Sequence, residues 1–255
     1  MKIHLISDSH IEFGVNTVPS VGSNLVVAAG DIGLMSNPNQ LEDYFIRLLD
    51  TTDNVIWVLG NHEFYHSEYE ETLDNALTLA DKLGIHLLDV ALGTENLELD
   101  GVKFWGTTFW TDLANNDWFV RDTVHRGLND FYVIKKQNGS NFSAQQSYEI
   151  NAKSRTLINW DADVVITHHC PTMIPHPLYP VSRVTYAFNN TGLEQQIADS
   201  SIKYWFYGHT HSSAVKEYNG TIVMSNQVGY RKPGPGDDVD WQEEAGYDPR
   251  LVVEI

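Results

Sequence analysis

The sequence predicts an α/β fold. Short apolar runs rich in β-branched residues recur along the chain, and several, such as Leu25–Ala29, are apolar at every position rather than at alternate ones. Such runs are typical of strands covered on both faces, as in α/β proteins. Segments with helical spacing lie between the early strands, which predicts βαβ units.

The expected strands are short and are spread over the whole chain. We place them at Lys2–Ser7, Leu25–Ala29, Val55–Leu59, Lys103–Trp110, Ala162–Thr167, Lys203–Tyr207, Thr221–Ser225 and Leu251–Glu254. The later part of the chain is richer in strands than in helices.

The expected helices carry recognisable start and stop signals. Ser67 and Glu70 have the spacing of a capping box, and Gly84 ends the apolar pattern that follows them. Thr191–Glu194 repeats that start signal. Two further helices are expected at Gln40–Leu49 and Ser143–Ile158.

Two segments fit this alternation less well. Thr111–Asn141 has few regular signals but several aromatic residues, and Arg231–Asp248 combines Pro-Gly repeats with acidic residues. We therefore expect one domain over residues 1–255, with a cap or lid insertion around 111–141 and a solvated acidic loop around 231–248. The aromatic residues of 111–141 could form a lid over a ligand or pack the insertion onto the sheet, and we favour packing.

The charge of the chain is strongly negative. It has 16 Lys and Arg against 34 Asp and Glu, a formal net charge of −18. Long-range repulsion from such a surface counts against binding to long nucleic acids. Taken alone, the charge would also count against small phosphorylated substrates.

The compartment can be inferred from cysteine use and hydropathy. Cys170 is the one cysteine, so an internal disulfide is excluded and no oxidising compartment is implied. We see neither a signal-peptide pattern nor an apolar run of membrane-spanning length. The expectation is a cytoplasmic protein without a membrane partner, whose oligomeric state is unknown.

Polar clusters follow five of the expected strands at the point where each ends. They are Asp8-Ser9-His10, Gly30-Asp31, Gly60-Asn61-His62-Glu63, His168-His169-Cys170-Pro171 and Gly208-His209-Thr210-His211. Each residue alone has an ordinary structural explanation, such as a helix cap, a turn or a buried histidine. All five together, each at a strand end, predict one site at the edge of the sheet where ligands bind in α/β proteins.

The residue types in these clusters suit a metal. Carboxylate, imidazole and amide ligands favour borderline divalent ions, and the lack of clustered thiolates argues against a zinc ribbon or iron–sulfur centre. Residues two apart in extended backbone point the same way, so Asp8 and His10 can face one cavity, as can His209 and His211.

These clusters, in this order, resemble the motifs of the calcineurin-like metallophosphoesterase superfamily, and they span residues 8 to 211. The resemblance implies a four-layer αββα sandwich of two mixed β-sheets flanked by helices. It also implies a dinuclear metal site at the carboxyl ends of the strands. The cofactors would be two divalent or trivalent metal ions, with Mn, Fe or Zn favoured.

The resemblance also assigns roles residue by residue. Asp31 would bridge both metals, and the remaining expected ligands are Asp8, His10 and His211 for the first and Asn61, His168 and His209 for the second. His62 would contact the phosphate and protonate the leaving oxygen, so the expected catalytic residues are His62, Asp31 and Asn61. Glu63 would orient neighbouring groups.

Two adjacent histidines stand where the resemblance requires one ligand. Strand alternation prevents both from pointing inward equally, and we prefer His168 because it directly closes the strand. His169 remains the alternative, or a substrate-side residue. Cys170 is expected to be a small buried residue without a nucleophilic role.

The expected function is hydrolysis of a small phosphate ester, monoester or diester, by a hydroxide that bridges two metals. Two divalent ions against two carboxylate ligands would make the cleft locally attractive to an anion despite the net charge. The expected substrate-binding residues are His62, Asn61, His169 and His125 of the 111–141 segment. The alternatives are a non-catalytic binding or scaffolding module, a nuclease, or a protein phosphatase of the same fold.

Overall fold

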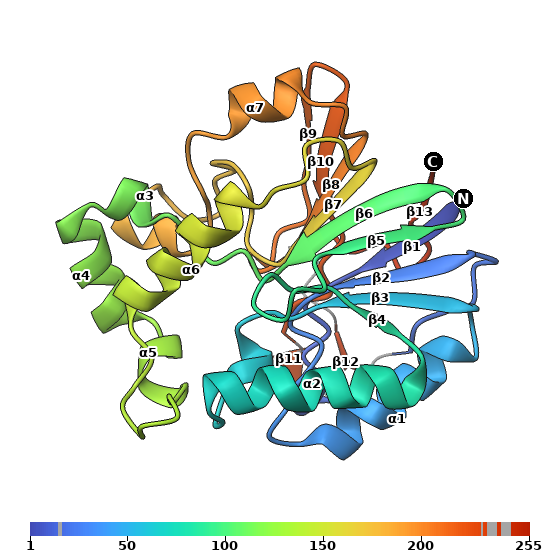
Figure 1. Ribbon diagram of the computed structural model, residues 1–255, viewed down its shortest axis with the longest axis horizontal. Helices are drawn as coiled ribbons and strands as arrows, with labels where there is room; N and C mark the ends of the chain where they lie inside the picture. The colour runs from blue at the N-terminus through green and yellow to red at the C-terminus, as the bar shows by residue number, and fades with distance from the viewer. Residues whose placement is uncertain (15–16, 231, 234–238, 241–245) are drawn as a thin grey trace.

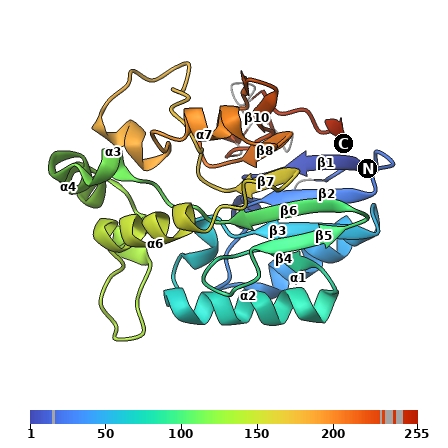
Figure 2. The ribbon, with the colours of Figure 1, turned by 45° about the horizontal axis from the view of Figure 1, so that its top comes forward.

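The computed structural model contains two β-sheets packed face to face and flanked by helices (Figures 1 and 2). It describes residues 1–14, 17–230, 232–233, 239–240 and 246–255. Two mixed sheets flanked by helices are the architecture that the sequence predicts.

The first sheet has five strands in the order β13-β1-β2-β3-β4, parallel except for β13. Its strands are β13 (Val252–Glu254), β1 (Lys2–Ile6), β2 (Leu25–Ala29), β3 (Asn54–Val58) and β4 (His86–Leu87). Every residue of β2 is buried, as its uninterrupted apolar sequence predicts.

The second sheet has six strands in the order β5-β6-β7-β8-β10-β9, with antiparallel strands at both edges. Its strands are β5 (Asn96–Leu99), β6 (Val102–Thr107), β7 (Val164–Thr167), β8 (Tyr204–Tyr207), β10 (Thr221–Ser225) and β9 (Val215–Tyr218). A separate two-stranded sheet pairs β11 (Lys232–Pro233) with β12 (Val239–Asp240).

The helices lie on the outer faces of the sheets and beyond their carboxyl ends. They are α1 (Pro38–Leu49), α2 (Tyr69–Leu83), α3 (Leu113–Asn116), α4 (Trp118–Gly127), α5 (Asp130–Val133), α6 (Ala144–Thr156) and α7 (Glu194–Asp199). Figure 1 shows α1 and α2 along the first sheet, with α3, α4 and α5 past the carboxyl ends of the strands. Short 3-10 helices are η1 (Ile11–Phe13), η2 (His62–Phe64) and η3 (Arg183–Ala187).

Three apolar clusters separate these layers. Leu5 and Val27 of the first sheet meet Phe104 and Phe206 of the second in the central cluster. A second cluster fills the space between the first sheet and α1 and α2, and a third lies between the second sheet and the residues around α7. Burial on both faces fixes the two sheets relative to each other and so positions the loops at their common edge.

Both expected helix starts are wrong in detail. Helix α2 begins at Tyr69 with Glu68 as its N-cap residue, because Glu68 pairs with Lys135 as an isolated β-bridge that delays the helix. Thr191 does not cap α7, because its hydroxyl donates to Asp112 at 2.5 Å. Ser143, by contrast, caps α6 by accepting from the Gln146 N–H.

The irregular segments also differ from expectation. Segment 111–141 is not irregular throughout, since it forms α3, α4 and α5. The strand expected to run to Trp110 ends at Thr107. Most of the acidic loop expected around 231–248 lies outside the described residues. No helix in the described part of the chain has the length and apolar character needed to cross a membrane.

Candidate metal centre

Five loops bring the expected site residues to one edge of the molecule. They follow β1, β2, β3, β7 and β8, whose carboxyl ends point the same way because these strands run parallel within their sheets. Backbone bonds join the first two loops, since Asp8 N donates to Gly30 O at 2.9 Å and His10 N donates to Asp31 O at 3.0 Å. Backbone hydrogen bonds therefore hold these two loops of the site together.

Two glycines allow the close approach of these loops. A Cβ atom at Gly60 would lie 2.1 Å from Asp31 Oδ1, and one at Gly208 would lie 2.6 Å from Asp8 Oδ2. Since real Cβ contacts are never this short, a side chain at either position would displace a carboxylate. The glycines that precede the site residues are thus required by space.

Two groups of potential ligand atoms share Asp31. One comprises Asp8, His10, Asp31 and His211, and the other Asp31, His168 and His209, with the atoms of each group within 4.8 Å of one another. In the first, His10 Nε2 lies 3.7 Å from Asp31 Oδ2, and His211 Nε2 lies 3.5 Å from Asp8 Oδ1. Asp31 is the only residue that the two groups have in common, which is the arrangement of a dinuclear centre.

Asn61 completes the second group. Its Oδ1 lies 3.1 Å from His168 Nε2, which in turn is 3.2 Å from His209 Nδ1 and 3.4 Å from Asp31 Oδ1. Imidazole nitrogen, carboxylate oxygen and amide oxygen atoms therefore converge on one point. A cation satisfies such a set better than hydrogen bonds can.

The protonation states of His209 and His211 also fit metal binding, whereas the pKa of His168 is raised to about 9 in the metal-free protein, chiefly because the effect of burial is outweighed by Asp31. Burial lowers the pKa of His209 well below its usual value, and burial together with nearby His10 lowers that of His211 to about 3. Both imidazoles are thus neutral, as a metal ligand must be. His209 Nε2 is buried and has no hydrogen-bond partner among the described residues.

The pKa values of the two carboxylates are shifted in opposite directions. Burial raises the pKa of Asp8 to about 6, with nearby Asp31 adding to the effect. Burial also opposes ionisation of Asp31, but His168 and His62 outweigh it and hold the Asp31 pKa well below its usual value. The shared residue is therefore the more acidic of the two, which suits a bridging ligand.

The structure separates the two adjacent histidines. His168 lies in the second group of ligand atoms, whereas His169 is in neither. The His169 ring donates from Nδ1 to Thr108 O at 3.1 Å and packs against the rings of Trp110 and His209. His169 therefore packs against the His209 ring and is not among the residues that line the cavity.

Glu63 ties the loops after β2 and β3 together. Its carboxylate accepts the backbone N–H groups of Asp31 at 3.0 Å, Ile32 at 2.8 Å and Gly60 at 2.7 Å. Burial raises its pKa to about 7, although these bonds oppose the rise. The glutamate holds Asp31 in place without contacting the ligand atoms.

His62 lies beside the two groups and has three further partners. Glu12 Oε1 accepts from its Nδ1 at 2.9 Å, Tyr230 Oη lies 3.3 Å from its Nε2, and the Tyr65 ring stacks on it with centroids 4.2 Å apart. Burial lowers the pKa of His62, but Asp31 and Glu12 outweigh it and raise the pKa to about 9. His62 therefore holds a proton next to the candidate metal site.

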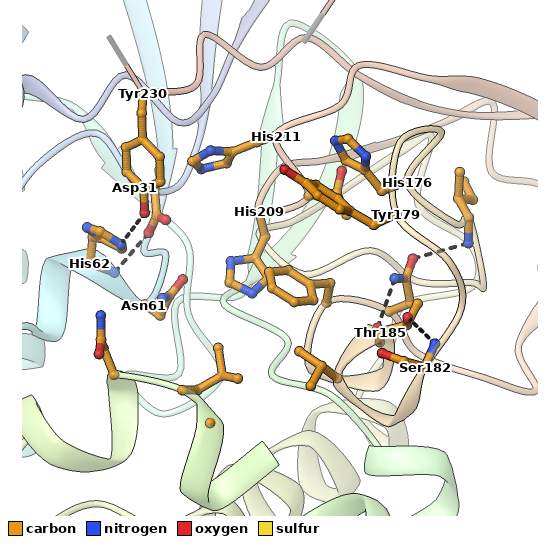
Figure 3. Close-up of a pocket in the computed structure, with 18 of the residues that line it drawn as sticks. Asp31, Asn61, His62, His176, Tyr179, Ser182, Thr185, His209, His211 and Tyr230 are labelled. Atoms are coloured by element: carbon orange, nitrogen blue, oxygen red, sulfur yellow. Dashed lines mark hydrogen bonds between the residues drawn. The ribbon is translucent and has the colours of Figure 1, made fainter. Parts of the chain in front are cut away.

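A cavity of about 510 Å³ extends outward from these residues. Figure 3 shows Asp31, His62, Asn61 and Tyr230 on one side and His176, Tyr179, Ser182 and Thr185 on the other, with His209 and His211 between them. Segment 111–141 contributes Gly127, Leu128 and Asn129 to the wall. This volume is typical of a site for small molecules.

His125 does not lie in this cavity. It lines a separate surface pocket with Trp118 and Arg121, and its ring packs against Phe131. Helix α4 turns His125 toward α6, where its Nδ1 accepts from Ala144 N at 3.4 Å. The expectation that His125 binds substrate is not supported by this placement.

Sequence reasoning missed several residues of the site. Glu12, Tyr65, Asp130 and Tyr230 all contact His62 or Asn61, directly or through one partner. The expected extended alternation could not have found Glu12, because Asp8 and His10 both have positive φ and Glu12 lies in η1. The others come from parts of the chain that carry no motif.

The fold and the site are those of an α/β protein with a candidate dinuclear metal centre. The family model of the calcineurin-like phosphoesterases matches residues 1–213, and the chain belongs to that family. This agrees with the resemblance that the motifs show.

The chain is also similar to individual proteins. It is 26% identical over 222 residues to an uncharacterised protein of Acanthamoeba polyphaga mimivirus, covering 79% of this chain and 76% of that one. Among solved structures, a phosphopantetheinyl hydrolase from Mycobacterium tuberculosis superposes with a TM-score of 0.70 at 16% identity, covering 90% of this chain and 89% of that one. A dimetal phosphatase from Danio rerio gives 0.52 at 16% identity, covering 90% and 88%. At these identities the two structures show a shared fold.

Proposed function

We propose that this protein is a metal-dependent hydrolase of small phosphate esters. The observation that carries the proposal is the sharing of Asp31 by two groups of ligand atoms at the inner end of a cavity. Membership of a phosphoesterase family supports the same chemistry.

The donor set names the residues that would hold two metal ions. Asp8, His10, Asp31 and His211 would hold one, and Asp31, Asn61, His168 and His209 the other. Oxygen and imidazole ligands in this mixture suit Mn, Fe or Zn. When bound, the ions would supply Lewis acidity at the phosphoryl oxygens and lower the pKa of coordinated water.

His62 is the proposed general acid. Glu12 holds its Nδ1, so Nε2 is the atom that faces the cavity and Tyr230. A histidine that keeps its proton to about pH 9 can deliver it to the leaving oxygen at neutral pH. Asn61 and Asp31 would complete the catalytic set as ligands that also face the phosphate.

Three features favour small esters over long nucleic acids or proteins as substrates. The cavity has the volume of a small-molecule site, its wall is formed by the chain itself, and the net charge is −18. The substrate is proposed at this level of class, with monoesters and diesters both included.

The proposal is tested by a phosphate-release screen. Protein stripped with a chelator is reloaded separately with Mn²⁺, Fe²⁺ and Zn²⁺ and assayed against nucleotides, sugar phosphates and bis-p-nitrophenyl phosphate. We expect activity that disappears on stripping and returns with at least one metal. A fully loaded protein that hydrolyses no ester would overturn the proposal in favour of a binding module.

A further inference from the structure

One tyrosine lies directly beside the proposed general acid. Tyr230 lines the cavity, and its Oη is 3.3 Å from His62 Nε2. Figure 3 shows the hydroxyl end of the Tyr230 side chain directed at His62. Tyr230 belongs to none of the five polar clusters that follow the strands, so its place next to the proton-bearing atom of His62 is not explained by them.

The backbone that leads to Tyr230 is tied to the loops that carry the ligand groups. Gly229 N donates to Asp8 O at 3.0 Å. Gln227 Oε1 accepts from His211 N at 2.5 Å. These bonds fix the chain before Tyr230 against the loop after β1 and the loop after β8, so the position of the tyrosine is set by the same loops as the candidate metal site.

The Tyr230 ring packs among other rings of the site. Its centroid lies 4.5 Å from that of His10 and 4.4 Å from that of His211, with the His211 pair edge-to-face. Phe13 of η1 also contacts it edge-to-face, with centroids 5.4 Å apart. Such ring pairs restrict the orientation of an aromatic side chain. Tyr230 is nevertheless 39% exposed, so a ligand in the cavity can reach it.

The separation of the two polar atoms allows both to contact one oxygen. Because His62 Nε2 and Tyr230 Oη are 3.3 Å apart, a third atom can lie within about 3 Å of both at once. A protonated imidazole donates one hydrogen bond from Nε2, and a phenolic hydroxyl donates another. An ester oxygen has lone pairs for two donors. The pair His62 and Tyr230 therefore marks a position where two donors can converge on a single oxygen.

We propose that Tyr230 is a further catalytic residue, whose hydroxyl donates a hydrogen bond to the leaving oxygen of the ester while His62 protonates that oxygen. The inference rests on the proposed phosphoesterase function and adds a residue to its site. Negative charge develops on the leaving oxygen as its bond to phosphorus breaks, and a donor fixed beside it stabilises that charge. Water supplies the new oxygen on phosphorus, the alcohol product takes its proton from His62 Nε2, and the O–H bond of Tyr230 stays intact.

The test removes the hydroxyl and keeps the ring. Tyr230→Phe retains the ring contacts with His10 and His211, so its metal content should equal that of the unmodified protein. The probes are phenyl phosphate and p-nitrophenyl phosphate, or methyl phenyl phosphate and methyl p-nitrophenyl phosphate if the protein hydrolyses diesters. The two members of each pair differ in how much the leaving oxygen needs a donor.

We expect Tyr230→Phe to lower kcat/KM for the phenyl ester about tenfold or more and to change it little for the p-nitrophenyl ester, because p-nitrophenolate leaves without help from a donor. Tyr132→Phe is the control. It removes an exposed hydroxyl that donates to Arg126 O outside the lining of the cavity, and it should leave both rates unchanged.

A second variant separates direct contact with the ester from an effect through His62. Tyr230→Phe is combined with His62→Asn, and the phenyl ester is assayed again. We expect Tyr230→Phe to lower the phenyl-ester rate in this background as well, because its hydroxyl donates to the leaving oxygen independently of His62. Equal rates for His62→Asn and the double variant would overturn the inference, because Tyr230 would then act only by orienting His62.

The same assays separate this inference from the proposed function. Hydrolysis by the unmodified protein, together with an equal loss on both esters or no loss in Tyr230→Phe, contradicts the inference alone. Absence of hydrolysis of every ester by metal-loaded protein contradicts both.

Discussion

Asp130 accepts a hydrogen bond from Asn61 Nδ2 at 2.9 Å, across 69 positions of sequence. The same Asp130 oxygen accepts from Tyr65 Oη at 2.6 Å. Because Nδ2 is held by a carboxylate, Asn61 must turn its Oδ1 toward His168 and the candidate metal site. Segment 111–141 therefore reaches the centre through Asp130, not through His125 or its exposed aromatic residues.

Replacing Asp130 should weaken the second metal position. In Asp130→Asn the Asn61 amide faces a partner that can present a donor instead of an acceptor, so its orientation is no longer fixed. We expect metal affinity or activity to fall about 10–100-fold, as is typical when a partner of a metal ligand is removed. Metal titration followed by assay measures this. Asp122→Asn, which removes a surface ion pair of α4, is the control and should leave both quantities near those of the unmodified protein.

Glu12 is expected to act through His62. Glu12 Oε1 is within 3.1 Å of both His10 Nδ1 and His62 Nδ1, which fixes the orientation of both rings. Glu12→Gln should lower kcat most for esters of poor leaving groups, by about tenfold or more, because only these need a proton from a well-placed acid.

The leaving-group dependence distinguishes positioning from general damage. Phenyl and p-nitrophenyl esters are compared in Glu12→Gln and in Glu98→Gln, which alters an exposed position. An equal loss on both esters in Glu12→Gln would contradict the assigned role.

Gly60→Ala should abolish metal binding. The added Cβ would lie 2.1 Å from Asp31 Oδ1 and displace the shared carboxylate. Gly127→Ala is the control, because no atom lies within 4 Å of its added Cβ. Metal content after dialysis is the readout. Retention of two ions by Gly60→Ala would contradict the close packing of Gly60 against Asp31.

The metal-free protein should lose stability as pH rises from about 6.5 to 9. The pKa values of His62 and His168 are both raised in the folded state to about 9, so the stability from their protonated forms is fully present below 6.5 and is lost toward 9. Each protonated histidine contributes on the order of 3 kcal/mol at most to the free energy of unfolding. Thermal unfolding of metal-free protein against pH checks it. A His62→Asn variant with an equally steep decline would contradict the assignment.

The sequence predicts the fold well where burial is uniform. Strands such as β2 and β7 are apolar on both faces, which leaves little choice of structure. The missed strands β5 and β9 are at sheet edges and partly exposed, so their sequences, Asn96–Leu99 and Val215–Tyr218, lack that signal. The helix starts were predicted wrongly because of long-range partners: Lys135 pairs with Glu68 as an isolated β-bridge, and Asp112 accepts the hydroxyl of Thr191.

The site residues also fall into those that could be predicted from the sequence and those that could not. Residues at strand ends, such as Asp8 and His209, are brought together by the topology, and their proximity could be foreseen. The cavity wall could not be predicted, because residues 174–189 and Tyr230 contain no motif and their position depends on the conformation of loops. The direction of the His125 side chain could not be predicted, because it depends on the position of His125 on α4.

The central claim is that Asp31 is shared by two metal ions that drive ester hydrolysis. The most direct measurement is metal content together with bis-p-nitrophenyl phosphate hydrolysis for Asp31→Asn, with Asp43→Asn on the exposed face of α1 as the control. We predict two bound ions and activity in the unmodified protein and the control, and loss of both in Asp31→Asn. Undiminished hydrolysis by Asp31→Asn would contradict the account.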